Sequence, residues 1–248
     1  RKSGSRMKAL LCKAFGPPES LVLEELPSKA LANGQVRIAV HAAGVNFPDV
    51  LMIQGKYQFK PPFPFAPGSE VAGEVVETAP DVSSLRRGDR VMASLHAGGY
   101  ADEVVCPATS CMTMPPSMDY ETAAGFTMTY GTSYYALVQR AAIQPGEVLL
   151  VHGASGGVGT ATLDIGRNLG AKLIATGGSD RKLERVAQHY AVEHVINYKT
   201  TPNWKDKVKE LTLANGADVI YDAVGGDILE NSLRCAAWNG RVLVIGFA

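Results

Sequence analysis

The sequence lacks the features that mark secreted, membrane-spanning or polyanion-binding proteins. Its 248 residues include only four cysteines (Cys12, Cys106, Cys111 and Cys235), at neither CxxC nor metal-binding spacing, so reduced thiols and a cytoplasmic location are expected. No apolar run approaches the roughly 18 residues that a membrane span needs. Lysine plus arginine and aspartate plus glutamate each number 24, and a net charge of zero provides no attraction to nucleic acid. Residues 1–6, which precede Met7, are interpreted as an artificial N-terminal addition that does not belong to the fold.

The first half of the chain has the pattern of short β-strands. Hydrophobic residues make up 46% of the sequence, enough for a real core in one or two domains. Val36, Ile38 and Val40 alternate with other residues and predict a strand over 34–42. Further short strands are expected at 71–76, 89–93 and 100–105, separated by glycine-containing turns. This pattern predicts a barrel-like or irregular β domain.

The second half alternates between strand and helix. A helical stretch over 119–140, interrupted near Gly131, precedes the alternation. Strands are expected at 148–152, 172–176, 194–197, 219–221 and 241–245, with helices at 158–169, 181–189, 204–213 and 228–237. Repeated β–α units imply parallel strands joined by right-handed crossovers, and hence a doubly wound α/β sheet.

A glycine-rich turn between the first of these strands and its helix is the strongest functional signal. The residues are Ala154, Ser155, Gly156, Gly157, Val158 and Gly159. Unpaired amides and the positive end of the helix dipole at such a turn bind a pyrophosphate. The glycines allow the backbone to approach the ligand and the helix to lie close to the sheet. The alternative interpretation is a tight turn without a ligand.

The end of the second strand favours NADP over NAD. NAD sites usually place an acidic residue there for the ribose 2′-hydroxyl, but small residues follow Thr176 in this chain. Ser179, Arg181 and Lys182 can meet a 2′-phosphate. Asp180 is the exception, and we interpret it as a helix N-cap or first-turn acid.

Several motifs together resemble the medium-chain dehydrogenase/reductase superfamily, and within it the zinc-free quinone oxidoreductase (zeta-crystallin-like) branch. They are AAGVNFPDVLMIQGKY, PFAPGSEVAGEVVE, RRGDRV, TYGTSYYAL, VLLVHGASGGVG, VINY and DAVGGD. The resemblance implies a GroES-like β-rich catalytic domain at 7–120, a Rossmann coenzyme domain at 121–248 and a cleft between them. Family members continue into a sixth strand and a C-terminal return, so the chain is expected to be C-terminally truncated. A homodimer is left open.

The same resemblance implies a site without metal. Zinc-dependent members hold zinc through residues at the positions of Asn46, Ser69 and Met128 in this chain. An amide, a hydroxyl and a thioether do not form a thiolate/imidazole tetrahedral site. None of the five histidines pairs with a cysteine or acid at ligand spacing.

Three catalytic candidates follow from the resemblance. Asn46 donates a hydrogen bond to a carbonyl or to the coenzyme amide, and Thr132 lies near the nicotinamide. Tyr57 is either a proton donor or an aromatic wall of the cleft. Asp49 is interpreted as a cap or internal hydrogen-bond partner. A hydroxyl bonded back to its own helix is the alternative for Thr132.

The resemblance also assigns coenzyme contacts outside the glycine-rich turn. Gly178 and Lys182 are expected at the 2′-phosphate and Tyr198 beside its ribose, although Tyr198 also fits an ordinary strand-end aromatic. Ala223 and Phe247 are expected to border the nicotinamide half.

The expected function is NADPH-dependent hydride transfer to a quinone or similar conjugated carbonyl. The alternatives are an enoyl or 2-alkenal reductase and a non-enzymatic coenzyme- or RNA-binding protein. Five further residues are expected either to line an apolar acceptor pocket or to belong to the protein core. They are Met52, Phe59, Phe63, Phe65 and Met128.

Overall fold

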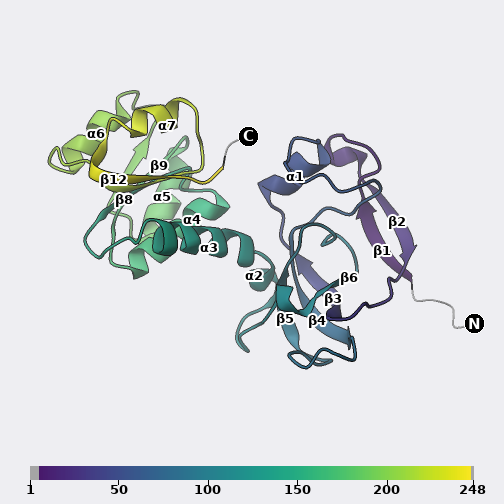
Figure 1. Cartoon of the computed structure of the whole chain (residues 1–248). Helices are drawn as coiled ribbons and strands as arrows, with labels where there is room; N and C mark the ends of the chain where they lie inside the picture. The colour runs from purple at the N-terminus through teal and green to yellow at the C-terminus, as the bar shows by residue number, and fades with distance from the viewer. Residues whose placement is uncertain (1–5, 247–248) are drawn as a thin grey trace, which may run out of the picture. The chain divides into compact units, whose positions relative to one another are not determined.

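The computed structural model describes residues 6–246 of the chain. It consists of two compact units, Arg1–Met128 and Thr129–Ala248 (Figure 1). Each unit has its own hydrophobic core and is described by itself. Phe247, expected to border the nicotinamide, lies outside the described residues.

The first unit is built on a five-stranded antiparallel sheet in the order β6-β3-β4-β5-β7. The strands are β3 (Gln35–Ala43), β4 (Glu70–Thr78), β5 (Arg90–Ser94), β6 (Glu103–Pro107) and β7 (Cys111–Thr113). The alternating residues Val36 and Ile38 are fully buried and pack with Val71, Val75 and Val91. Period-two hydrophobic patterning therefore produced the expected β domain.

Smaller elements surround this sheet. They are an antiparallel ribbon of β1 (Arg6–Leu11) and β2 (Val22–Pro27) and two helices, α1 (Phe47–Ile53) and α2 (Tyr120–Ala124). The strand predicted at 100–105 begins only at Glu103. The preceding residues instead bridge to β1, because Leu10 N donates to Tyr100 O and Asp102 N donates to Lys8 O.

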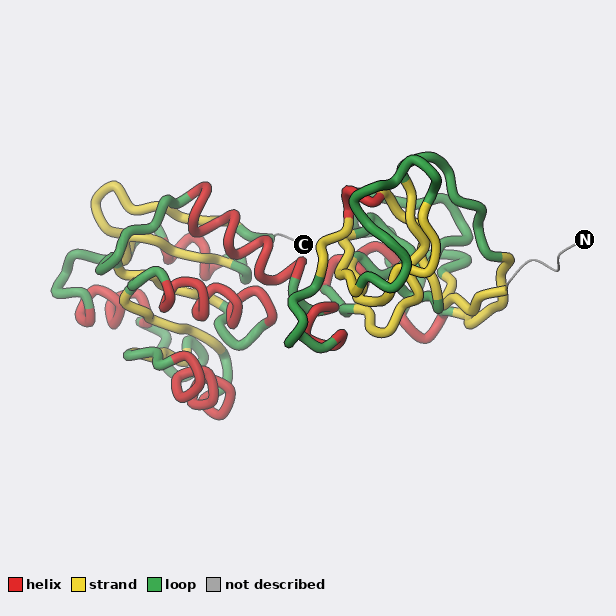
Figure 2. Tube along the Cα trace, turned by 90° about the horizontal axis from the view of Figure 1, so that it is seen from below, coloured by secondary structure: helices red, strands yellow, loops and turns green. Residues whose placement is uncertain are grey.

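The second unit contains a parallel sheet in the order β10-β9-β8-β11-β12. Its strands are β8 (Val148–His152), β9 (Lys172–Gly177), β10 (His194–Asn197), β11 (Ala217–Asp222) and β12 (Ala236–Val244). The connecting helices are α4 (Gly157–Asn168), α5 (Asp180–Tyr190), α6 (Trp204–Leu211) and α7 (Asp227–Ser232). Helices lie on both faces of this sheet, with α6 and α7 opposite α4 (Figures 1 and 2). The predicted doubly wound α/β fold is confirmed.

The strand order places the glycine-rich turn at the centre of this sheet. The chain runs from β8 outward to β9 and β10, then crosses back to β11 on the other side of β8. Ligands of such sheets bind beyond the carboxyl ends of the strands at this switch point. The turn that follows His152 at the end of β8 occupies this position.

Two predicted helices differ from the structure. The stretch 119–140 breaks at Gly125–Phe126, between α2 and α3 (Thr127–Tyr134), and ends in a π-helical turn over Tyr135–Arg140. Gly131 lies inside α3. The helix predicted at 228–237 ends at Ser232, because Ala236 pairs with Ala217 and already belongs to β12. Within residues 6–246, no helix is long and apolar enough to cross a membrane.

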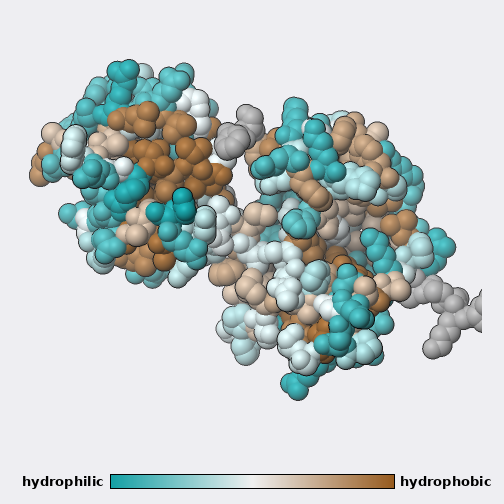
Figure 3. Space-filling model, viewed as in Figure 1, coloured by the Kyte–Doolittle hydropathy of each residue, from teal (hydrophilic) through white to brown (hydrophobic). Residues whose placement is uncertain are grey.

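β12 forms one edge of the parallel sheet in the described chain. Figure 3 shows an apolar surface on the second unit, in the region where Figure 1 places α7 and β12. Leu233, which follows α7, is 65% exposed, and Val244 at the end of β12 is 48% exposed. An apolar sheet edge of this kind favours pairing with further polypeptide.

Candidate functional site

The glycine-rich turn has a backbone that only glycine accommodates at two positions. Gly153 adopts a left-handed φ of 64° directly after β8. A Cβ on Gly159 would lie 2.4 Å from the carbonyl oxygen of Gly153 and 2.8 Å from Ala154 Cα. Any side chain at position 159 would therefore push the first turn of α4 away from β8.

The structure shows which amides of this turn are occupied. Ala154 N donates to Thr176 O at 3.0 Å, and Gly156 N donates to Gly153 O at 2.9 Å. The first amides of a helix have no acceptor within it, which leaves the N–H groups of Gly157, Val158 and Gly159 as donors. Ala154 is fully buried, so its contribution is to hold the turn against β9.

The residues at this helix start fit a diphosphate. Ser155, Gly156 and Gly157 are exposed, and the turn carries no side chain larger than a serine hydroxymethyl at these three positions. The N-terminus of α4 adds the positive end of a twelve-residue helix. Unpaired donors, open backbone and positive dipole together provide the chemistry that an anionic linker requires.

A second group of residues lies at the end of β9. Gly178 faces two side chains, since a Cβ there would be 2.8 Å from Lys199 Cε and 3.4 Å from Tyr198 Cε2. Lys182, in the first turn of α5, lines a separate hollow together with Ser155 of the glycine-rich turn. The sequence analysis did not predict a role for Lys199. Its position directly after Tyr198, just beyond the end of β10, was the signal that could have indicated one.

Asp180 is tied to the fold. Ser179 is the N-cap of α5 and Asp180 its first residue, as expected for a first-turn acid. Asp180 Oδ1 accepts a hydrogen bond from Asn197 Nδ2 at 2.8 Å, which joins α5 to the end of β10. This hydrogen bond gives the Asp180 carboxylate a structural partner within the fold.

A buried histidine at the end of β8 is linked to the glycine-rich turn through Thr176. His152 is fully buried, with Nδ1 2.7 Å from Thr176 Oγ1 and Nε2 2.8 Å from Ser232 Oγ. Desolvation lowers the pKa of His152 to about 4, partly opposed by Asp222. His152 is thus a neutral group that packs and forms hydrogen bonds. It holds the side chain of Thr176, whose carbonyl oxygen accepts the hydrogen bond from Ala154 N.

Lowering the pH is expected to destabilise the second unit. Because the folded pKa of His152 is about 4 against an ordinary 6.5, the unfolded chain binds the proton first. Stability is therefore full above pH 6.5 and is lost as pH falls toward 4, by about 2 kcal/mol between pH 7 and 5. Urea unfolding followed by the fluorescence of Trp204, whose ring contacts His152, measures this. His152→Gln should flatten the slope, and an unchanged slope would contradict the assignment.

In the first unit, Asn46 is held by two carboxylates. It precedes α1 as its N-cap, and its backbone N donates to Asp49 Oδ2 at 2.9 Å. Its side-chain Nδ2 donates to Glu70 Oε1 at 2.8 Å. Asp49 is thus the cap and internal partner that the sequence indicated.

Glu70 is the centre of this network. It is 1% exposed and also accepts hydrogen bonds from Thr127 Oγ1 at 2.7 Å and Met128 N at 2.9 Å. Ser69 Oγ donates to Asp49 Oδ1 at 2.7 Å. Asn46, Ser69 and Met128, the positions compared with zinc ligands, therefore converge on two buried carboxylates.

The donor set at these positions does not fit zinc. An amide, a hydroxyl and a thioether replace thiolate and imidazole, and the polar groups of Asn46 and Ser69 are hydrogen-bonded to Glu70 and Asp49. Residues 6–246 contain no group of three or more histidine, cysteine or acidic side chains arranged to hold a metal ion.

Tyr100 completes the network and was missed by the sequence reading. Its hydroxyl donates to Asp49 Oδ2 at 3.0 Å. Burial first, and then the charge of Asp49, raise the pKa of Tyr100, so the phenol stays protonated. Tyr100 comes from a loop far from Asp49 in sequence, and no motif links the two residues.

Tyr57 follows α1 after a turn at Gly55, where φ is 69°. It is half-buried and packs against a core cluster that includes Met52, Ile53 and Phe65. No partner within residues 6–246 binds its hydroxyl. This environment agrees with an aromatic wall and leaves the phenol available, so both interpretations stand.

The remaining predicted residues lie in the second unit. Thr132 is a partly buried residue of α3, and Ala223 follows β11 and packs against the core of the parallel sheet. Their roles stay predictions.

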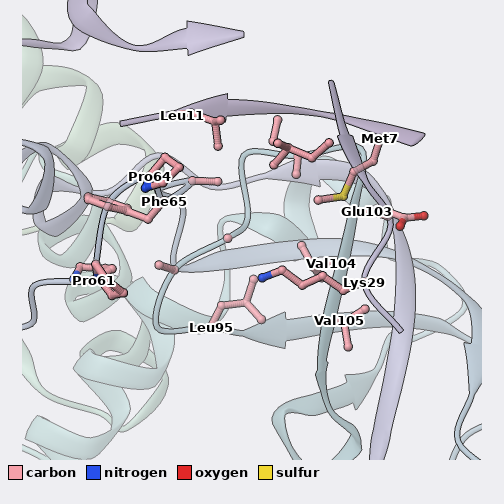
Figure 4. Close-up of a pocket in the computed structure, with 17 residues that line it drawn as sticks. Met7, Leu11, Lys29, Pro61, Pro64, Phe65, Leu95, Glu103, Val104 and Val105 are labelled. Carbon is pink, nitrogen blue, oxygen red and sulfur yellow. The ribbon is translucent and has the colours of Figure 1, made fainter. Parts of the chain in front are cut away.

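The five apolar residues considered for an acceptor pocket separate into two groups. Met52 and Phe65 are core residues, whereas Phe59 and Phe63 are each 43% exposed and Met128 is partly buried. An apolar cavity of about 370 Å³ lies between β1, β6 and the loop that carries Pro61, Pro62 and Pro64 (Figure 4). Only Phe65 of the five lines this cavity, so it is not the predicted pocket.

Comparisons with known proteins agree with both halves of the fold. Residues 32–116 match the alcohol dehydrogenase GroES-like domain and residues 157–248 the zinc-binding dehydrogenase family. The latter match contains none of positions 46, 69 and 128, so its name carries no information on zinc here.

Individual relatives are also similar over most of this chain. The quinone oxidoreductase-like protein 2 homolog of Nematostella vectensis is 44% identical over 97% of this chain and 66% of its own length. The quinone oxidoreductase of Rattus norvegicus is 38% identical over 97% and 73%. The chain thus spans about two thirds of the length of the first of these relatives.

Two solved structures with different printed activities are similar to this chain in fold. A Pseudomonas syringae quinone oxidoreductase superposes with a TM-score of 0.88 at 31% identity, covering 96% of this chain and 73% of that one. The CurK enoyl reductase superposes with a TM-score of 0.89 at 28% identity, covering 98% and 75%.

Proposed function

The chain belongs to the quinone oxidoreductase family of medium-chain dehydrogenases/reductases, and on that premise we propose that it reduces a quinone or similar conjugated carbonyl with NADPH, without zinc. The observation that carries the proposal is the start of α4, where Gly157, Val158 and Gly159 present free helix-start amides beside an exposed glycine backbone. Such a site binds the diphosphate of a dinucleotide.

NADPH supplies the hydride when it is bound. The N-terminus of α4 holds the diphosphate, and Lys199 and Lys182 provide positive charge for the 2′-phosphate. One Nδ2–H of Asn46 donates a hydrogen bond to Glu70 Oε1. Its second Nδ2 proton and its Oδ1 are the groups with which it orients a carboxamide or a carbonyl acceptor.

The network around Glu70 and Asp49 supports zinc independence. Each of these carboxylates already accepts three hydrogen bonds from protein groups. Both are thereby compensated without a cation. Polarisation of the acceptor then falls to hydrogen-bond donors, with Asn46 the first candidate.

Reversing the charge of Lys199 is expected to weaken NADPH binding selectively. Lys199 packs over Gly178, where a 2′-phosphate is expected, so Lys199→Glu should raise the Kd for NADPH about 30-fold or more. NADH, which lacks that phosphate, should change by less than about threefold. Fluorescence titration of both coenzymes measures this, with Lys205→Glu on α6 as the matched control. Equal losses for the two coenzymes would contradict a role at the 2′-phosphate.

An enoyl reductase is the second candidate function. The fold similarity to CurK enoyl reductase and the unbound phenol of Tyr57 favour it. Reduction of an activated C=C bond needs a proton as well as a hydride, whereas a quinone yields an oxyanion that solvent can protonate.

Tyr57→Phe distinguishes the two. If Tyr57 donates the proton, kcat with an enone should fall about 100-fold or more, while the rate with a quinone should change little. Tyr120→Phe, on α2, is the control for loss of a hydroxyl elsewhere in the unit. A change below about threefold with both acceptors would leave Tyr57 as a wall of the site.

Loss of NADPH absorbance with a panel of quinones, enones and enoyl thioesters, with and without a zinc chelator, tests the proposed function. A quinone preference that the chelator does not affect is expected. Absence of NADPH oxidation with every acceptor, together with single-stranded RNA binding that weakens steeply with salt, would instead support a non-enzymatic RNA-binding protein.

A further inference from the structure

The fold brings together two cysteines that the sequence spacing did not connect. Cys106 Sγ and Cys111 Sγ are 3.6 Å apart. Cys106 is 3% exposed and belongs to the core of the first unit, while Cys111 is only partly buried and lies at its border. The other two thiols, Cys12 and Cys235, are buried in separate clusters.

The two sulfurs lie where the sheet of the first unit closes on itself. Cys106 is in β6 and pairs with Val36 of β3, whereas Cys111 is the first residue of β7 and pairs with Ala93 of β5. β6 and β7 are the two edges of the five-stranded sheet. A short 3-10 turn, Ala108–Ser110, joins them, so the thiol contact links both edges of the sheet.

We propose that Cys106 and Cys111 form a reversible, peroxide-sensitive dithiol that is oxidised to an intrachain disulfide. The geometry supports this directly. A disulfide requires sulfurs about 2.05 Å apart, so closing the observed contact needs a movement of about 1.5 Å. Cys111 begins a three-residue edge strand after a turn and is only partly buried, so it can shift more readily than Cys106, which is 3% exposed.

The reaction balances with hydrogen peroxide as the oxidant. The two thiols lose two electrons and their two protons, an S–S bond forms, and the O–O bond breaks to yield two water molecules. A hydrogen bond from Cys111 lowers the pKa of Cys106, against the effect of burial. This favours the thiolate on which sulfur exchange and oxidation depend.

The disulfide would close the sheet covalently between its edges. It would tie β6 to β7 and restrict separation of β3 from β5 through their neighbours. The consequence is a more stable first unit under oxidising conditions, independent of coenzyme binding in the second unit. In a reducing compartment such pairs act as reversible sensors.

Mass spectrometry of the full chain tests the proposal. After brief treatment with hydrogen peroxide, the intact mass should fall by two hydrogens, and a peptide linking Cys106 to Cys111 should appear. Dithiothreitol should restore both the mass and alkylation of Cys111 by iodoacetamide. The melting temperature should rise by several degrees on oxidation and return on reduction.

Cys111→Ser should abolish the mass loss, and Cys235→Ser is the control that should retain it. Because the linked peptide is sought in the unmodified sequence, failure of a variant to fold leaves the test intact. Oxygen addition to either cysteine without a link, a link through Cys12 or Cys235, or a link between two chains would overturn the proposal.

Discussion

Replacing Gly156 with aspartate is expected to abolish coenzyme binding and leave the fold at least as stable. Gly156 is the N-cap of α4, with φ −82° and ψ 171°, a conformation that suits aspartate, a preferred N-cap residue. Its new carboxylate would interact favourably with the helix dipole. The same charge would lie where the diphosphate binds. At a separation of about 5 Å and an effective dielectric constant near 20, repulsion costs about 3 kcal/mol, or at least 100-fold in Kd.

Gly156→Asn is the matched control. It has the same shape and also caps helices well, but it carries no charge. A Cβ at this position would lie 3.3 Å from Gly153 O, so both variants share the same small steric cost. NADPH titration and urea unfolding of the pair separate charge from shape. Equal affinity of the two variants for NADPH would contradict diphosphate binding at this turn.

Replacing Glu70 with alanine is expected to destabilise the first unit by about 3–5 kcal/mol. Glu70 is buried, and its removal leaves Asn46 Nδ2, Thr127 Oγ1 and Met128 N without their acceptor. An unpaired donor costs about 1–3 kcal/mol when it is buried, and these three donors are partly buried. Both tryptophans lie in the second unit, so hydrogen exchange of β4 peptides is the appropriate measurement.

Glu70→Gln separates stability from the positioning of Asn46. Glutamine retains the size and one acceptor oxygen, so the unit should remain folded with a smaller loss of stability. Its neutral amide holds Asn46 less firmly than a carboxylate does, and turnover with NADPH should fall while the KM for NADPH stays constant. A Glu70→Ala variant that exchanges like the unmodified protein would contradict the structural role of this network.

The elements that the sequence predicted best are those with strong local periodicity. The buried parallel strands near Val148–His152 and the helix after the glycine-rich turn follow from apolar runs and turn chemistry alone. The helix predicted at 228–237 was too long, because ILENSLRCAA has helical composition and only pairing of Ala236 with Ala217 makes its end a strand. Tertiary pairing outweighed local propensity at that point.

The site residues divide in the same way. Gly156 and its neighbours were found because a local motif carries their chemistry. Glu70, Tyr100 and Lys199 were missed because their contacts join segments distant in sequence: Glu70 to α1 and α3, Tyr100 to Asp49, and Lys199 to Gly178. The Cys106–Cys111 contact is local by comparison, since the two residues are five positions apart. It depends on the 3-10 turn Ala108–Ser110 between β6 and β7, which neither CxxC nor metal-binding spacing predicts.

Calorimetric titration of the full chain with NADPH, and with NADH for comparison, tests whether the protein binds the coenzyme. Saturable one-to-one binding of NADPH is expected, tighter than that of NADH and accompanied by a rise in the melting temperature of the protein. Well-folded protein that binds neither coenzyme and shows no thermal shift would contradict it.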